Sequence, residues 1–155
     1  MSTAAVVFVD VFVLREHGAA LEVLVLRRSA AGRCPGAWET VHGSIEATET
    51  PVDAARRELR EETGLEAQRL YNASRVEAFY RHGADAVALI PVFAAFVARG
   101  AEVRLSDEHD RAEWMTPADA ARRCAWPRER RALEDIVALF GSGDAGPLED
   151  VLRVC

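Results

Sequence analysis

Apolar and β-branched residues gather in five segments of the chain, separated by polar or glycine-containing connections. These segments are residues 5–14, 22–28, 37–43, 70–80 and 86–98. Their length and composition predict β-strands. The last two strands are separated by a turn around His82 and Gly83.

One amphipathic helix has both of its ends marked in the sequence. Thr50 can cap the helix, Pro51 suits the first helical position, and Asp53 stands where a capping box places an acid. Gly64 is a typical stop signal. The helix is therefore predicted over residues 51–63.

The second half of the chain predicts a charged loop from Glu102 to Glu113, then two helix starts at Thr116 and Pro127, the later helix ending at Gly141. Residues 144–155 are expected to form a peripheral tail. Strands and helices follow no strict βαβ alternation, and no internal repeat or linker is visible. The sequence therefore predicts a single α/β domain over residues 1–155, with one mixed sheet covered by helices.

Composition restricts the partners. The formal charge of −6 is unfavourable for binding long nucleic acid, which needs clustered cations. No apolar run is long enough to span a bilayer, and the N-terminus lacks the basic segment of a signal peptide, so a cytoplasmic, membrane-free protein is expected. Three widely spaced cysteines indicate free thiols. A small anionic substrate with a metal ion fits these limits.

Three glutamates of the predicted helix are spaced for one helix face. Glu58, Glu61 and Glu62 differ by three and four positions, which brings their carboxylates together. Such like charges repel each other, so a bound cation or a nearby arginine would relieve the cost. Oxygen ligands of this kind suit Mg²⁺ or Mn²⁺. A solvated acidic face is the alternative interpretation.

The whole segment 43–65 reads Gly-x5-Glu-x7-Arg-Glu-Leu-x-Glu-Glu-x-Gly-Leu and is identified as a complete Nudix box. The resemblance implies an α/β/α sandwich with a loop-helix-loop catalytic motif. It also implies a Mg²⁺-dependent pyrophosphohydrolase, with Mn²⁺ as a substitute, and makes a homodimer plausible. Glu58, Glu61 and Glu62 would bind the metal, and one of them would take a proton from the attacking water. Arg57 and Glu49 would form a structural pair.

Two residues outside the helix are further metal candidates. Family members often carry Pro-Gly-Gly before the box, whereas this chain has Val41-His42-Gly43, so the carbonyl of His42 would occupy the metal-binding position. The imidazole of His42 has either a packing role or a ligand role. A downstream carboxylate often completes Nudix sites, and Glu108 is the preferred candidate, with Asp107 and Asp110 as competitors.

The substrate is less defined by the sequence. Similarity to the dihydroneopterin triphosphate and nucleoside triphosphate branch rests partly on Trp38 and Trp126, which either stack on a base or lie in the core. Arg27 and Arg28 could hold phosphates, but neighbours on a strand face opposite sides, so one of them at most should do so. Tyr80 resembles a tyrosine of dinucleoside polyphosphate hydrolases, or it simply ends a strand.

Other substrates and one other class of function stay open. Coenzyme A and ADP-ribose are alternative substrates, and a nucleotide-binding module without catalysis is the alternative function. Such a module would be expected to lose one or more of the metal-binding carboxylates, whereas Glu58, Glu61 and Glu62 are all present. The expected partner is thus a small nucleotide-like molecule.

Overall fold

A computed structural model describes all residues from 1 to 155. Eight strands form one mixed sheet, and four α-helices and one 3-10 helix accompany it. The strands are β1 (Thr3–Val6), β2 (Phe8–His17), β3 (Ala20–Arg28), β4 (Trp38–Glu39), β5 (Val41–Ser44), β6 (Arg69–Arg81), β7 (Ala86–Phe96) and β8 (His109–Met115). The helices are α1 (Pro51–Thr63), α2 (Pro117–Arg123), α3 (Pro127–Phe140), η1 (Gly146–Leu148) and α4 (Glu149–Leu152).

Strand β2 organises the sheet. It pairs in parallel with β7 and antiparallel with both β3 and β5. Strand β1 also runs parallel to β7, whereas β6 pairs antiparallel with β7 and β8 antiparallel with β3. The predicted mixed sheet is therefore confirmed.

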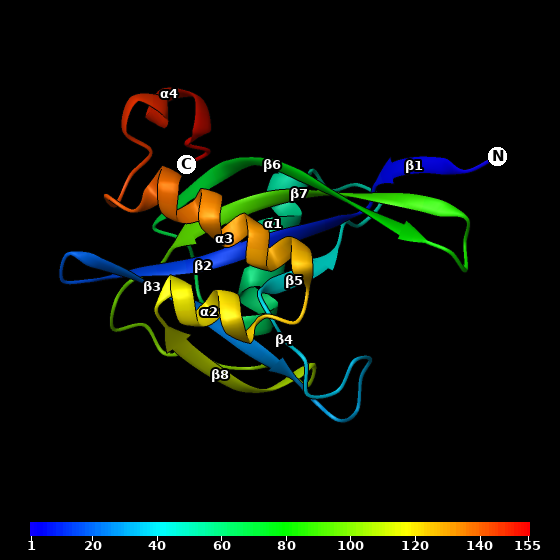
Figure 1. The fold of residues 1–155 in the computed structure, drawn as a ribbon, viewed down its shortest axis with the longest axis horizontal. Helices are drawn as coiled ribbons and strands as arrows, with labels where there is room; N and C mark the ends of the chain where they lie inside the picture. The colour runs from blue at the N-terminus through cyan, green and yellow to red at the C-terminus, as the bar shows by residue number, and fades with distance from the viewer.

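Helices cover both faces of this sheet, with α2 and α3 on one side and α1 on the other (Figure 1). Side chains of β2 alternate between two cores: Phe12 and Leu14 pack with α2 and α3, while Val11 and Val13 pack with α1. A strand buried on both faces explains why residues 9–14 are apolar except for Asp10. The predicted α/β/α sandwich is correct.

Three predicted boundaries differ from the structure. The strand expected at 5–14 is divided into β1 and β2 at Val7, and the strand expected at 37–43 is divided into β4 and β5 at Thr40. At Thr40, the hydroxyl donates to the carbonyl of Val11 at 2.6 Å and the amide donates to Glu129, so the chain turns from one partner to another. The expected charged loop is wrong at its end, because β8 already begins at His109.

The tail from residue 144, expected at the periphery, pairs with β6. The amide of Val154 donates to the carbonyl of Leu70 at 2.8 Å, and the Leu70 amide donates to Cys155 at 3.0 Å. Ala145 and Leu152 are buried in the core beneath α3. The tail therefore covers part of the outer edge of β6.

None of the helices has the length and apolar composition needed to cross a lipid bilayer.

Helix α1 has the predicted bounds and the predicted caps. The Thr50 hydroxyl accepts a hydrogen bond from the Asp53 amide at 3.2 Å. Gly64 adopts a left-handed φ of 71°, and its amide donates to Arg60. Local sequence signals alone therefore determine where the helix that carries the glutamates begins and ends.

Loss of the helix cap should destabilise the fold measurably. Thr50→Ala should lower the free energy of unfolding by about 1 kcal/mol, because the Asp53 amide loses its acceptor. Urea unfolding measures the difference. Thr48→Ala, at an exposed position in the preceding turn, is the control and should leave stability unchanged. Equal stability of the two variants would contradict the capping role.

Candidate metal centre and substrate pocket

Arg57 fastens α1 to the loop before it. Its Nε and Nη2 donate to the two carboxylate oxygens of Glu49 at 2.5 and 2.9 Å, and Nη2 also donates to the carbonyl of Ser44 at 2.8 Å. Its Nη1 donates to Glu58 at 2.8 Å and to Glu61 at 3.1 Å. One guanidinium thus holds three carboxylates and the end of β5 in a fixed arrangement.

Gly43 provides the space that Glu58 occupies. A Cβ atom added at Gly43 would lie 2.0 Å from the Cδ atom of Glu58, so the carboxylate of Glu58 would have to leave its position. The carboxylate of Glu58 therefore rests directly against the backbone of β5. Burial raises the pKa of Glu58, although Arg57 opposes this shift.

Glu62 is the most deeply buried acid of the helix, with 1% of its surface exposed. Its Oε2 accepts a hydrogen bond from the His42 amide at 3.2 Å, while its Oε1 has no hydrogen-bond partner. Burial, followed by the charges of Glu58 and Glu108, raises the pKa of Glu62 to about 10. Without a cation, an ionised Glu62 is thus strongly disfavoured.

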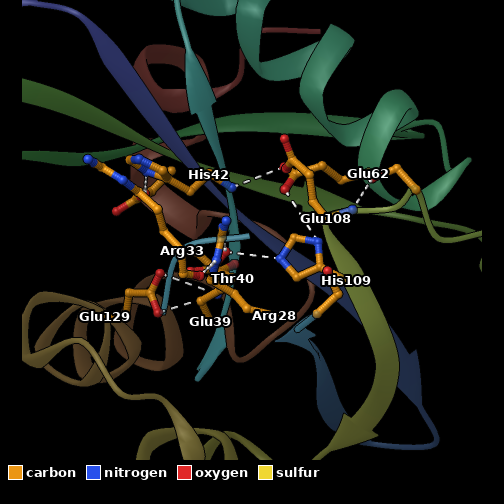
Figure 2. A network of polar contacts seen from close by, with 12 residues as sticks. Arg28, Arg33, Glu39, Thr40, His42, Glu62, Glu108, His109 and Glu129 are labelled. Atoms are coloured by element: carbon orange, nitrogen blue, oxygen red, sulfur yellow. Dashed lines mark hydrogen bonds and ion pairs between the residues drawn. The ribbon is translucent and has the colours of Figure 1, made fainter. Parts of the chain in front are cut away.

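Glu61 and Glu108 complete the acidic cluster. The side chain of Glu61 is 58% exposed and points from the same helix turn toward solvent. Glu108 comes from the loop before β8 and lies beside Glu62 (Figure 2). Its competitor Asp110 pairs instead with Arg27 at 2.7 Å, outside the cluster. Carboxylates from two distant segments therefore meet at one place.

This arrangement fits a divalent cation. The charges of Glu58 and Glu108 act on Glu62, which is buried with an unsatisfied oxygen, and Glu61 shares the Arg57 guanidinium with Glu58. A hard cation with oxygen ligands would relieve both the repulsion and the unmet hydrogen bond.

A second buried group lies behind Glu62. The side chain of His109 is fully buried, and its Nε2 lies 3.0 Å from Oε2 of Glu39. Its Nδ1 lies 3.7 Å from Oε1 of Glu62 and has no hydrogen-bond partner. Glu39 in turn accepts from Arg28 at 3.2 Å. Neither Glu39 nor His109 is singled out by the sequence analysis.

A pocket of about 310 Å³ opens next to this group. It combines aromatic and apolar side chains with four arginines and a thiol. Its lining residues are Phe8, Arg28, Arg33, Cys34, Glu39, His42, Phe79, Arg81, Ile90, Trp126 and Arg128. The rings of Phe79 and Trp126 meet edge to face, with centroids 6.0 Å apart. The pocket can therefore hold a flat ring beside an anionic group.

A triad around the buried Asp10 supports the pocket. The carboxylate of Asp10 accepts from His42 Nδ1 at 2.7 Å and from Arg128 Nε and Nη2 at 2.8 and 3.1 Å. Burial opposes ionisation of Asp10, but the hydrogen bonds from His42 and Arg128 prevail and lower its pKa. The imidazole of His42 is thereby held in one orientation at the pocket wall.

Three of the six residues predicted to contact substrate line the pocket, namely Arg28, His42 and Trp126. The other three do not. Arg27 pairs with Asp110, Trp38 packs against the core beside Arg123, and the Tyr80 hydroxyl donates to Asp85 at 2.9 Å.

Successive side chains of a strand point to opposite faces, which explains why a residue lines the pocket while its neighbour in the sequence does not. On β6, Phe79 and Arg81 line the pocket while Tyr80 lies outside it. On β3, Arg28 lines it and Arg27 does not. An acid within an apolar strand, Asp10, was the one signal in the sequence that pointed to the buried triad, because such a residue needs a partner.

The comparisons with known proteins agree with this geometry. A family model described as the NUDIX domain matches residues 5–136, so the chain belongs to the Nudix family. Members of this family use divalent metal ions.

Two relatives match most of this chain. The chain is 35% identical over 137 residues to a Myxococcus xanthus protein named octanoyltransferase, covering 84% of this chain and 36% of that protein. It is 30% identical over 131 residues to a MutT-like protein of Streptomyces ambofaciens, covering 84% of this chain and 75% of that one. The chain thus spans about a third of the first relative's length.

Solved structures share the fold. An Ap4A hydrolase of C. elegans superposes with a TM-score of 0.71 at 20% identity, covering 89% of this chain and 96% of that one. The E. coli dihydroneopterin triphosphate pyrophosphohydrolase gives 0.68 at 23% identity, with 84% and 94% covered. A MutT protein of Methanosarcina mazei gives 0.69 at 26% identity, with 86% and 92% covered.

The Arg57–Glu49 pair predicts a dependence of stability on pH. Hydrogen bonds from Arg57, and then from the Glu46 amide, lower the pKa of Glu49 from 4.5 to about 2. Ionised Glu49 therefore stabilises the fold above about pH 4.5, and this contribution is lost as the pH falls toward 2. Glu49→Gln should be less stable than the wild type near neutral pH, and the difference should shrink as the pH falls through that window.

Urea unfolding of both proteins at several pH values checks this expectation. Glu66→Gln is the control, because Glu66 pairs with Arg60 only at the surface, and its effect should be small throughout. A deficit of Glu49→Gln that stays constant down to pH 2 would contradict the assigned pair.

Proposed function

We propose that the chain is a divalent-metal-dependent hydrolase that cuts a phosphoanhydride bond in a nucleotide-like substrate. The observation that carries the proposal is the cluster around Glu62, where a buried acid with an unsatisfied oxygen faces the charges of Glu58 and Glu108. A nucleotide-binding module without catalysis would not require such a costly arrangement. Mg²⁺ is the expected ion, with Mn²⁺ as a substitute.

Glu58, Glu61, Glu62 and Glu108 would hold the ion. When bound, it would neutralise charge on the diphosphate and acidify a water for attack on phosphorus. One of the glutamates would accept the proton of that water. Arg57 and Glu49 keep the helix seated on β5, and no covalent nucleophile is required. The carbonyl of His42 stays a candidate for a further contact.

The pocket would hold the organic end of the substrate. Phe79 and Trp126 offer faces and edges for a flat ring, and Arg33 and Arg81 carry no carboxylate partner, so they are free to meet phosphate. These features favour a nucleoside triphosphate or dihydroneopterin triphosphate that releases pyrophosphate. The alternative substrates are ADP-ribose, dinucleoside polyphosphates and coenzyme A, because similarity of fold does not distinguish among these substrates.

A substrate panel with Mg²⁺ tests the reaction. One triphosphate should release pyrophosphate, and a chelator should abolish the release. Glu62→Gln should lower turnover by about a hundredfold or more, since it removes a charged ligand and a candidate base. Glu66→Gln, just beyond the helix and exposed, should keep wild-type turnover. Tight binding of a nucleotide in chelator without any turnover would favour the binding module.

Two adjacent residues of β6 test the pocket. Phe79→Ala should raise KM roughly tenfold with a smaller change in kcat, because stacking on a base contributes about 1–3 kcal/mol. Tyr80→Ala is the matched control, since Tyr80 is similarly exposed but lies outside the pocket. Steady-state kinetics on the substrate found in the panel separates the two. If Tyr80→Ala raised KM as much as Phe79→Ala, the pocket assignment would be wrong.

A further inference from the structure

His109 lies between two carboxylates that come from different parts of the chain. Its Nε2 is 3.0 Å from Glu39 on β4, and its Nδ1 is 3.7 Å from Glu62 on α1. The imidazole and both carboxylates are almost completely buried. Figure 2 shows the imidazole between the two acids, with dashed lines from its nitrogens toward Glu39 and Glu62.

The contact between Nδ1 and Glu62 is incomplete in a specific way. Nδ1 of His109 and Oε1 of Glu62 are both buried without a hydrogen-bond partner, and they face each other. Buried polar atoms without partners are costly, so two of them face to face indicate a shared interaction. A shift of less than about 1 Å would bring the two atoms within hydrogen-bond distance.

The ring is anchored from its other side. Glu39 accepts from Arg28 at 3.2 Å in addition to its contact with His109. Burial opposes ionisation of Glu39, but His109 and Arg28 outweigh it and lower its pKa. The ionised Glu39 fixes the orientation of the imidazole, as carboxylates commonly do for histidines near metals.

The two oxygens of Glu62 are consequently supported from two strands. Oε2 accepts from the His42 amide of β5, while Oε1 faces His109 at the start of β8. A bond to each of the two oxygens would fix the plane of the carboxylate. Without the second one, the side chain could rotate about the first.

We propose that His109 is a positioning residue for the metal centre, holding Glu62 through Nδ1 while Glu39 holds the ring through Nε2. This inference rests on the proposed function, in which Glu62 is a metal ligand. In this role His109 would act through Glu62 and would not itself bind the ion. It keeps Oε1 of Glu62 aligned before the ion arrives, which raises metal affinity and the rate of the chemical step.

Two amide substitutions separate the two contacts of the ring. In His109→Asn, the short amide stands near the position of Nδ1 and can still meet Glu62. In His109→Gln, the longer amide stands near the position of Nε2, so it keeps Glu39 and loses Glu62. The two variants share their chemistry and differ by one methylene, which makes each the control for the other.

Mn²⁺ affinity, measured by electron paramagnetic resonance on the folded proteins, is the first readout. His109→Asn keeps the contact with Glu62 but loses the anchor at Glu39, so it should bind Mn²⁺ only slightly more weakly than the wild type. His109→Gln should bind Mn²⁺ about ten- to a hundredfold more weakly. In kinetics at saturating Mg²⁺, His109→Gln should lose kcat with KM unchanged. Equal affinities in both variants, whether both normal or both reduced, would overturn the positioning role.

Two further variants keep the outcome interpretable. Glu39→Gln loosens the ring without altering it and should weaken Mn²⁺ binding in the same direction; an unchanged affinity would count against the proposal. Glu62→Gln in the same titration tests the underlying function. If Glu62→Gln binds Mn²⁺ like the wild type, the metal assignment fails, whereas weak binding there with normal binding in His109→Gln removes only the role of His109.

Discussion

The gathering of like charges around Glu62 is the constraint on which the rest of the site depends. Burial and neighbouring carboxylates raise the pKa of Glu62 to about 10, so the protein must hold this side chain in place against its own electrostatics. Arg57 ties α1 to the loop before it, and Gly43 leaves room for Glu58 against β5. The helix caps, the box glycine and the arginine all serve to keep these acids close together.

The metal centre and the pocket share a wall, and His42 belongs to both. Its amide supports Glu62, whereas its imidazole is fixed by Asp10 at the side of the pocket. Arg28 likewise lines the pocket and contacts Glu39, which holds His109 behind the acidic cluster. A substrate bound along this wall would therefore place its organic end and its phosphates in contact with one rigid polar network.

Local signals in the sequence predicted the helix with the glutamates and a mixed sheet covered by helices, because caps and apolar periodicity act over a few residues. The sandwich followed from the resemblance to the Nudix family. Local signals could not give the facing of strands: Phe79 and Arg28 line the pocket, while their neighbours Tyr80 and Arg27 do not. Local signals also could not predict contacts between side chains that lie far apart in the sequence. Arg128 meets Asp10 across 118 positions, and His109 meets Glu39 across 70. The strand β8 was missed in part because its outer side chains are charged.

Thermal unfolding of the wild type and Glu62→Gln near pH 8, with and without Mg²⁺, tests the central claim most directly. Without metal, Glu62→Gln should be more stable, because it removes a buried acid that resists ionisation. With Mg²⁺ the wild type should become the more stable of the two proteins. Binding of the ion stabilises the folded state only where the metal-binding carboxylate of Glu62 is retained. A wild type that is more stable without metal and gains nothing from Mg²⁺ would contradict the claim.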